Sequence, residues 1–159
     1  MKNLNDLLAL LAKSDIEFVV IGGFAGVLHG STLVTRDLDL CTVLSAENIE
    51  KLRILLKDFR PKHRMTPQRL SFLTIPPAGQ SLNNLYLETD LGTVDFISSV
   101  TGVGDFKRLA QNAETIEVKG EKINIMSLSD LIQAKQSLGR DKDRLAATEL
   151  LAIQSKKKT

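Results

Sequence analysis

Hydrophobic and polar positions follow two different periods along the first part of the chain, and each period predicts its own kind of element. Leucines at three- and four-residue spacing predict an amphipathic helix over residues 4–12. A β-branched run over 17–21 ends at two glycines and predicts a strand that leads into a short helix over 24–28. Alternation of charged and aliphatic residues over 36–42 predicts a half-buried strand. Ser45 can cap a helix that runs to about residue 59.

The second part of the chain is predicted to form hairpins and then helices. All four prolines fall between residues 61 and 77, so this stretch is predicted to be mostly irregular or edge structure. Ser127 with an acid three residues later has the pattern of a capping box, and Gly139 ends the helix that follows. The elements predicted here are a hairpin of 84–89 with 93–98, a hairpin of 116–119 with 122–126, and helices over 127–138 and 142–153.

This order of elements indicates an α/β or α+β fold with a mixed sheet flanked by helices and followed by C-terminal helices. The long buried runs of an all-parallel sheet are missing. The chain has 159 residues and a mass of 17.5 kDa, which fits one domain spanning residues 1–159. With 43% apolar and 25% charged residues, the composition is that of a globular protein and excludes wholesale disorder.

Several classes of protein are excluded by what the sequence lacks. The longest apolar run, residues 18–28, is about half of the roughly 20 residues that a membrane helix needs. The stretch 7–12 lacks the flanks of a secretory signal. A single cysteine, Cys41, rules out an internal disulfide and a multi-cysteine zinc site. We therefore expect a soluble, cytoplasmic protein with no membrane partner.

Positive charge is concentrated in one segment although the net charge is only +2. Residues 51–69 contain seven lysines and arginines and one acid, Asp58. One interpretation is a solvated helix face. The other is a surface for a phosphate-rich partner such as a nucleic acid. Aromatic residues make up only 4% of the chain, so base stacking finds little support.

Two aspartates on the strand over 36–42 are the most informative residues for chemistry. Asp37 and Asp39 are two positions apart and therefore share one face of the strand, while Leu38 and Leu40 face the core. Taken alone, this pattern also fits a solvated outer face of a sheet.

Two further features favour a catalytic interpretation of these acids. Gly22 and Gly23 follow a strand, where backbone N–H groups can approach a phosphate closely, although a tight turn would explain the pair as well. Asp95 lies on a later strand opposite apolar neighbours, where a lone acid would usually be a surface residue. Three acids beside a glycine turn together indicate a two-metal phosphoryl-transfer site, since Mg²⁺ prefers carboxylate oxygens.

These motifs resemble the nucleotidyltransferases of the DNA polymerase β superfamily, specifically the small AbiEii-like bacterial toxins. The resemblance spans roughly residues 16–150. It is carried by an apolar strand ending in Gly22-Gly23, by Asp37-Leu38-Asp39, by Asp95, and by a helix with Lys135 followed by Gly139-Arg140-Asp141-Lys142-Asp143.

The resemblance implies a fold of the nucleotidyltransferase type and transfer of a nucleoside monophosphate from an NTP to an acceptor hydroxyl, with release of pyrophosphate. Asp37 and Asp39 would hold two Mg²⁺ or Mn²⁺ ions, and Asp95 would complete the metal site next to the acceptor hydroxyl. The remaining implied roles are phosphate binding by Gly22 and Gly23, and charge compensation by Lys135, Arg140 and Lys142, with Asp143 orienting one of these bases.

The acceptor and the partners stay open at this point. AbiEii-like relatives modify tRNA ends, other branches modify proteins or antibiotics, and a toxin role would bring an antitoxin as partner. Relatives commonly carry an arginine where this chain has Leu33, which leaves phosphate or acceptor binding in doubt. A catalytically degenerate or partner-dependent nucleotide-binding module is therefore the alternative, and a plain RNA-binding protein is a third. His29 is expected to be as much a capping residue as a functional one, and Cys41 to be structural.

Overall fold

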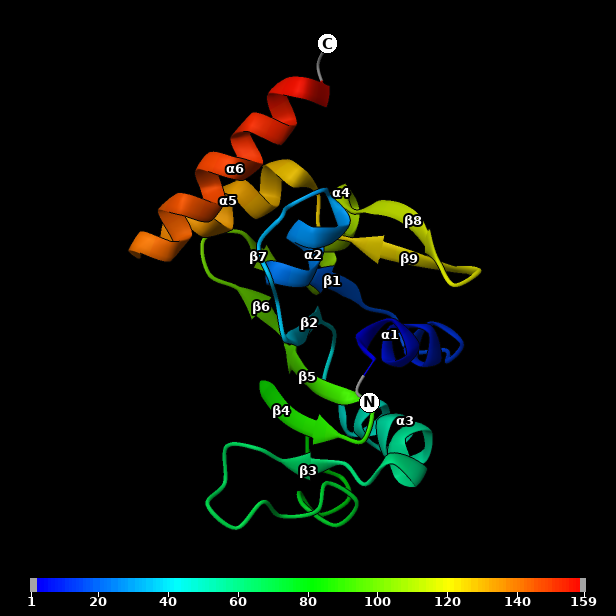
Figure 1. Cartoon of the computed structure of the whole chain (residues 1–159). Coiled ribbons are helices and arrows are strands. Elements are labelled where there is room, and N and C mark those ends of the chain that lie inside the picture. Colours follow the sequence, from blue (N-terminus) through cyan, green and yellow to red (C-terminus); the bar gives the residue numbers. More distant parts are fainter. Residues whose placement is uncertain (1–2, 158–159) are drawn as a thin grey trace.

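Seven strands form one mixed sheet, and helices cover it (Figure 1). The structure is a computed structural model that describes residues 3–157. The strands of the sheet lie in the order β3-β4-β5-β2-β1-β9-β8, with β2–β5 and β1–β9 parallel and all other neighbours antiparallel. Their bounds are β1 Val19–Ile21, β2 Asp37–Cys41, β3 Lys62–His63, β4 Asn84–Thr89, β5 Gly92–Ile97, β8 Glu114–Val118 and β9 Glu121–Ile125. A separate pair consists of β6 Ser99–Val100 and β7 Gly104–Asp105.

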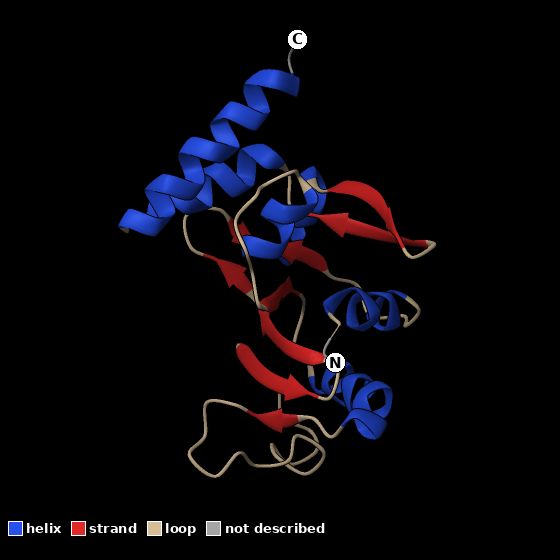
Figure 2. Ribbon diagram, viewed as in Figure 1, coloured by secondary structure: helices blue, strands red, loops and turns tan. Residues whose placement is uncertain are grey.

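The helices begin and end at residues whose side chains or backbone suit these positions. Ser45 accepts a hydrogen bond from the Asn48 N–H, and Ser127 accepts one from the Asp130 N–H, as N-caps should. Gly139 ends its helix in the left-handed conformation, at φ 69°, which a residue without a Cβ adopts at little cost. The helices are α1 Leu4–Ala12, α2 Gly22–Leu28, α3 Ala46–Leu56, α4 Phe106–Asn112, α5 Leu128–Leu138 and α6 Asp141–Lys157, and a 3₁₀ turn, Lys57–Phe59, follows α3 (Figure 2).

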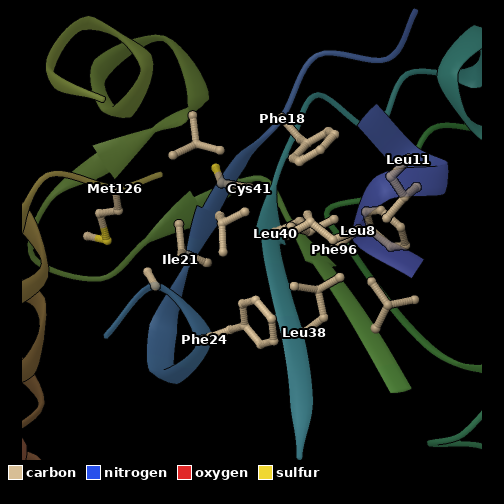
Figure 3. Close-up of a cluster of buried hydrophobic side chains, with 14 of the residues drawn as sticks. Leu8, Leu11, Phe18, Ile21, Phe24, Leu38, Leu40, Cys41, Phe96 and Met126 are labelled. Carbon is tan, nitrogen blue, oxygen red and sulfur yellow. The ribbon is translucent and has the colours of Figure 1, made fainter. Parts of the chain in front are cut away.

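One face of the sheet and α1 together form the centre of the core. Leu8 and Leu11 of α1 are fully buried and lie near Leu40 and Phe96 of the sheet (Figure 3). Burial alternates along β2, with Leu38 and Leu40 inaccessible to solvent and the two aspartates between and before them partly exposed. The two acids therefore lie on the face of the sheet that α1 does not cover.

The fold class predicted from the sequence is confirmed, and most predicted elements occur within one or two residues of their expected bounds. Three differences concern the helices. Helix α2 begins at Gly22, two residues earlier than predicted, because the glycines form its first turn. Helix α4 was not predicted: it has seven residues and buries only Leu109, so its apolar pattern is too short to show a period. Helix α6 continues to Lys157. Between residues 3 and 157, none of the helices has the length and apolar character that a bilayer-spanning segment needs.

Candidate active site

Asp39 and Asp95 lie directly opposite each other on adjacent strands. In the parallel pairing of β2 with β5, Asp39 is in register with Asp95, and Asp37 is in register with Thr93. Adjacent strands are about 4.8 Å apart, and residues in register point to the same face, so the two carboxylates are close neighbours. The sheet thus places Asp39 beside Asp95, although the two residues are more than 50 positions apart in the chain, and Asp37 lies two positions along β2 on the same face.

The pKa of the Asp39 carboxyl is raised by its burial and by the neighbouring acids. Burial, followed by the charges of Asp95 and Asp37, raises the pKa of Asp39 from 3.8 to about 6, and the charges of Lys135 and Arg64 oppose this rise. Ionised Asp39 is therefore an unfavourable charge in the ligand-free protein. A cation at this position would relieve the repulsion.

The glycine turn lies against Asp39. Gly22 has a φ of +65°, and a Cβ at this position would come within 2.6 Å of Asp39 Oδ2. A Cβ at Gly23 would come within 3.2 Å of Thr35 Oγ1. Within the described part of the chain, no side chain caps the start of α2. The absence of side chains at Gly22 and Gly23 therefore allows the backbone at the start of α2 to approach the acidic pair.

Asp95 has a partner that the sequence analysis missed. Arg64 donates from Nε to Asp95 Oδ1 over 3.0 Å and from Nη2 to Asp95 Oδ2, in a two-pronged ion pair. The Arg64 guanidinium also lies 5.5 Å from the centroid of the Tyr86 ring. Arg64 bonds through its backbone N–H to Tyr86 O, and Tyr86 is in register with Asp95, so the three side chains form a row across adjacent strands. A pattern confined to single segments could not reveal this pairing.

A cavity of about 440 Å³ opens beside Asp39. All five residues predicted to bind nucleotide line it. Leu33, which stands where the resembled family commonly has an arginine, lines it too. The predicted lining residues are Gly22, Gly23, Lys135, Arg140 and Lys142. The apolar part of the lining includes Val34, Leu145 and Leu150.

Asp143 holds two of the cationic residues of this cavity in place. Its side chain is 1% exposed, and it accepts hydrogen bonds from Arg140 Nε over 2.5 Å and Nη2 over 3.2 Å. Lys135 Nζ lies 3.9 Å from Asp143 Oδ1. The hydrogen bonds from Arg140 lower the pKa of Asp143, so the group is ionised at neutral pH. The expectation that Asp143 orients a base of the site agrees with this geometry.

Three solved structures that are similar to this chain are described as a nucleotidyltransferase, an adenylyltransferase and a nucleotidyltransferase-like protein. The chain superposes on the lincosamide antibiotic adenylyltransferase LnuA in its lincomycin-bound form with a TM-score of 0.58 and 15% identity, covering 94% of this chain and 93% of LnuA. A candidate nucleotidyltransferase from Thermotoga maritima gives a TM-score of 0.55 and 19% identity, covering 94% and 90%. The fold is that of a nucleotidyltransferase. No family model matches the chain, and no curated protein matches it in sequence.

A third solved structure shows a similar likeness. The chain matches a nucleotidyltransferase-like antigenic protein from Paracoccidioides brasiliensis with a TM-score of 0.56 and 16% identity, covering 95% of this chain and 75% of the other. The three structures share the nucleotidyltransferase fold with this chain, and none of the three is named as an AbiEii-like protein.

The basic segment 51–69 is largely neutralised by acids from elsewhere in the fold. Five of its seven basic residues form ion pairs, and the partners lie outside the segment, so a count along the sequence missed them. The pairs are Lys51 with Asp15 and Glu47, Arg53 with Glu50, Arg60 with Asp90, Arg64 with Asp95, and Arg69 with Glu88. The charge count that favoured a nucleic-acid surface therefore overstated the free charge.

His29 and Cys41 have structural environments. His29 is buried, its Nε2 lies 2.8 Å from the Met126 carbonyl oxygen, and its backbone ends α2. Burial raises the pKa of the Cys41 thiol to about 12, and the side chain lies in the core (Figure 3). A thiol with this pKa stays protonated at neutral pH, in line with the expected structural role.

The donor set beside the cavity suits a hard divalent cation. Carboxylate oxygens are preferred ligands of Mg²⁺, and the pKa of Asp39 is raised first by burial and then by the charges of Asp95 and Asp37, which a cation would offset. In residues 3–157, however, no three His, Cys, Asp or Glu side chains already converge as a metal site. Arg64 occupies the carboxylate of Asp95 instead. The residues thus fit the ion in chemistry, and Asp95 would join Asp37 and Asp39 as a ligand only after loosening its pair with Arg64.

Proposed function

We propose that the protein is a metal-dependent nucleotidyltransferase that transfers a nucleoside monophosphate from an NTP to an acceptor hydroxyl. The observation that carries this proposal is the register of Asp39 with Asp95 beside a glycine-lined cavity. The names of the structural neighbours, among them an antibiotic adenylyltransferase, support the same reaction.

The triphosphate would occupy the 440 Å³ cavity. Its phosphates lie toward Gly22 and Gly23, where Lys135, Arg140 and Lys142 compensate their charge. The nucleoside lies against the apolar part of the lining, where Val34 and Leu145 are exposed. This orientation directs the α-phosphorus toward Asp39, the acid that both cavities of the site share.

The reaction is an in-line displacement in which the protein mainly positions groups and compensates charge. The acceptor oxygen forms a bond to the α-phosphorus, the bond from that phosphorus to the bridging β-phosphate oxygen breaks, and pyrophosphate leaves. Asp37 and Asp39 would hold the divalent ions, Mg²⁺ or Mn²⁺, which supply charge stabilisation to the phosphates when bound. Asp95 lies beside Asp39 and can accept the proton of the acceptor hydroxyl.

A direct assay tests this proposal. The protein is incubated with each α-labelled NTP, Mg²⁺ or Mn²⁺ and a set of acceptors, and the labelled product is separated from the NTP. We expect transfer by the wild type, none by Asp39→Asn, and an unchanged rate for Asp58→Asn, a control that removes an exposed acid outside the site. Transfer by Asp39→Asn at the wild-type rate would refute the assignment of the acids.

Two observations favour a catalytically degenerate, nucleotide-binding module as the second candidate. The ion pair of Arg64 with Asp95 compensates an acid that the reaction would use, and Leu33 stands where relatives carry an arginine. For this candidate, Mg²⁺ with an NTP raises the melting temperature and no acceptor becomes labelled. A tRNA acceptor, a toxin role and an antitoxin partner stay predictions from the resemblance. The ion pairs that basic residues of the segment 51–69 form with acids outside it weaken the case for RNA.

A further inference from the structure

A second cavity lies on the Asp95 side of the site and adjoins the nucleotide cavity. It has a volume of about 290 Å³ and shares six lining residues with the larger cavity: Gly22, Gly23, Asp39, Leu131, Lys135 and Arg140. Because Asp95 lines only this second cavity, a molecule bound there lies at the acid beside which the acceptor hydroxyl is expected.

We propose that the second cavity binds the acceptor, and that the acceptor is a small molecule with a hydroxyl on an apolar body. This inference rests on the proposed nucleotidyl transfer. The walls away from Asp39 and Asp95 are mostly apolar. They come from β4, β5, β6 and α5 and from the residue that follows β9. They are formed mainly by Tyr86, Ile97, Val100, Met126, Ala134 and Leu138.

The size and lining of this cavity suit a small acceptor. Its volume is at the lower end of the roughly 300–1,000 Å³ that small-molecule sites span, and such sites combine apolar walls with a few polar groups. Leu138 is 44% exposed at the end of α5, where an apolar ligand would cover it. At the other end, Asp39 and Asp95 face the reacting hydroxyl.

Recognition of an RNA chain would require free positive charge along a surface, because phosphate contacts dominate the affinity of nucleic-acid binding. The bases that line the second cavity are Lys135 and Arg140, and both are held by Asp143. Arg64 is held by Asp95. Lys57 and Lys62 alone in the segment 51–69 lack an ion pair within the described residues. The observations therefore favour the small molecule over RNA.

Val100→Phe tests this assignment because it adds bulk to the second cavity without touching the first. Val43→Phe is the matched control, since Val43 is 52% exposed and lines neither cavity. Each protein receives Mg²⁺ and the four α-labelled NTPs with three acceptor pools. The pools are a library of hydroxylated small molecules that includes alkyl and aryl glycosides, purified tRNA, and the protein alone.

We expect label in the small-molecule pool, with kcat/KM for the acceptor reduced roughly tenfold or more by Val100→Phe and unchanged by Val43→Phe. Stabilisation by Mg²⁺ and NTP should be equal in all three proteins, which shows that the donor site is intact. Label in tRNA or in the protein but not in small molecules would overturn the inference and keep the proposed function. Small-molecule labelling that Val100→Phe leaves unchanged would overturn it too. Absence of any labelled product would instead refute the proposed nucleotidyl transfer, and stabilisation by Mg²⁺ and NTP would then indicate the nucleotide-binding module.

Discussion

Asp39→Asn replaces a carboxylate by an amide of nearly the same size at the point where three acids meet, and it should stabilise the metal-free protein. Burial and the charges of Asp95 and Asp37 raise the pKa of Asp39 from 3.8 to about 6. A shift of roughly two units at about 1.4 kcal/mol per unit means that ionised Asp39 costs the folded state up to about 3 kcal/mol. The amide must find hydrogen-bond partners of its own, so we expect a gain of about 1–3 kcal/mol at neutral pH.

The gain should depend on pH in a defined direction. Because the folded-state pKa of Asp39 is raised, the folded protein binds more protons than the unfolded chain between about pH 4 and pH 6. Wild-type stability therefore falls as the pH rises through this window, whereas Asp39→Asn has no such loss. The difference between the two proteins should be near zero below about pH 4 and reach its full value above about pH 6.

Urea denaturation in the presence of a chelator measures this difference in the free energy of unfolding. In thermal denaturation, the melting temperature should rise by roughly 2–4 °C per kcal/mol for a chain of this length. Asp58→Asn, at an exposed position, serves as the control and should follow the wild type at every pH. The same Asp39→Asn preparation should transfer no nucleotide. A variant that is less stable than the wild type at neutral pH, by an amount that does not change with pH, would refute the electrostatic reasoning.

Four further outcomes are expected. Mg²⁺ with the preferred NTP at about 100 times its Kd should stabilise the wild type by roughly 2.7 kcal/mol in thermal denaturation, and no shift with any NTP would contradict the donor site. Asp143→Asn should lower the melting temperature and raise the KM for NTP. The stability loss should shrink toward acid pH because the pKa of Asp143 is lowered in the folded state. A loss that is independent of pH would argue against the ion pairs. Arg64→Met should destabilise the metal-free protein and enlarge the stabilisation by Mg²⁺. Arg69→Met, which breaks the neighbouring pair with Glu88, should leave the stabilisation by Mg²⁺ unchanged. Equal Mg²⁺ effects in the two variants would show that Arg64 does not influence metal binding. Lys57→Glu with Lys62→Glu should reduce the salt dependence of any tRNA binding by about two charges, and an unchanged slope would place the RNA elsewhere.

The sequence was sufficient to predict the parts of the fold that depend on local periodicity. The alternation over 36–42 correctly predicted β2 and the face on which Asp37 and Asp39 lie. The cap at Ser127 and the stop at Gly139 correctly predicted α5. Each of these features depends on neighbours within a few residues, for which hydrogen-bond geometry is the same in any fold.

The parts of the site that come from strand order could not be read from the sequence. Pairing of β2 with β5 puts Asp39 in register with Asp95, but no local pattern specifies which strands become neighbours. The same limit applies to charge. The count over 51–69 gave a strongly basic segment, whereas the sheet brings Glu88, Asp90 and Asp95 next to its arginines. A charge count describes a surface only after the distant partners of each side chain are known.

Arg64 illustrates why this matters for the chemistry as well as for the fold. Asp95 is 8% exposed and lies beside another carboxylate, and a buried carboxylate needs a nearby cation to offset its loss of hydration. The guanidinium of Arg64 is that cation in the ligand-free protein. A divalent ion bound at Asp37 and Asp39 would supply the same compensation from the other side, so the two cations serve one cluster of acids. Stability without metal and affinity for metal are therefore expected to change in opposite directions when Arg64 is replaced, and the sequence motif of three acids alone contains no hint of this coupling.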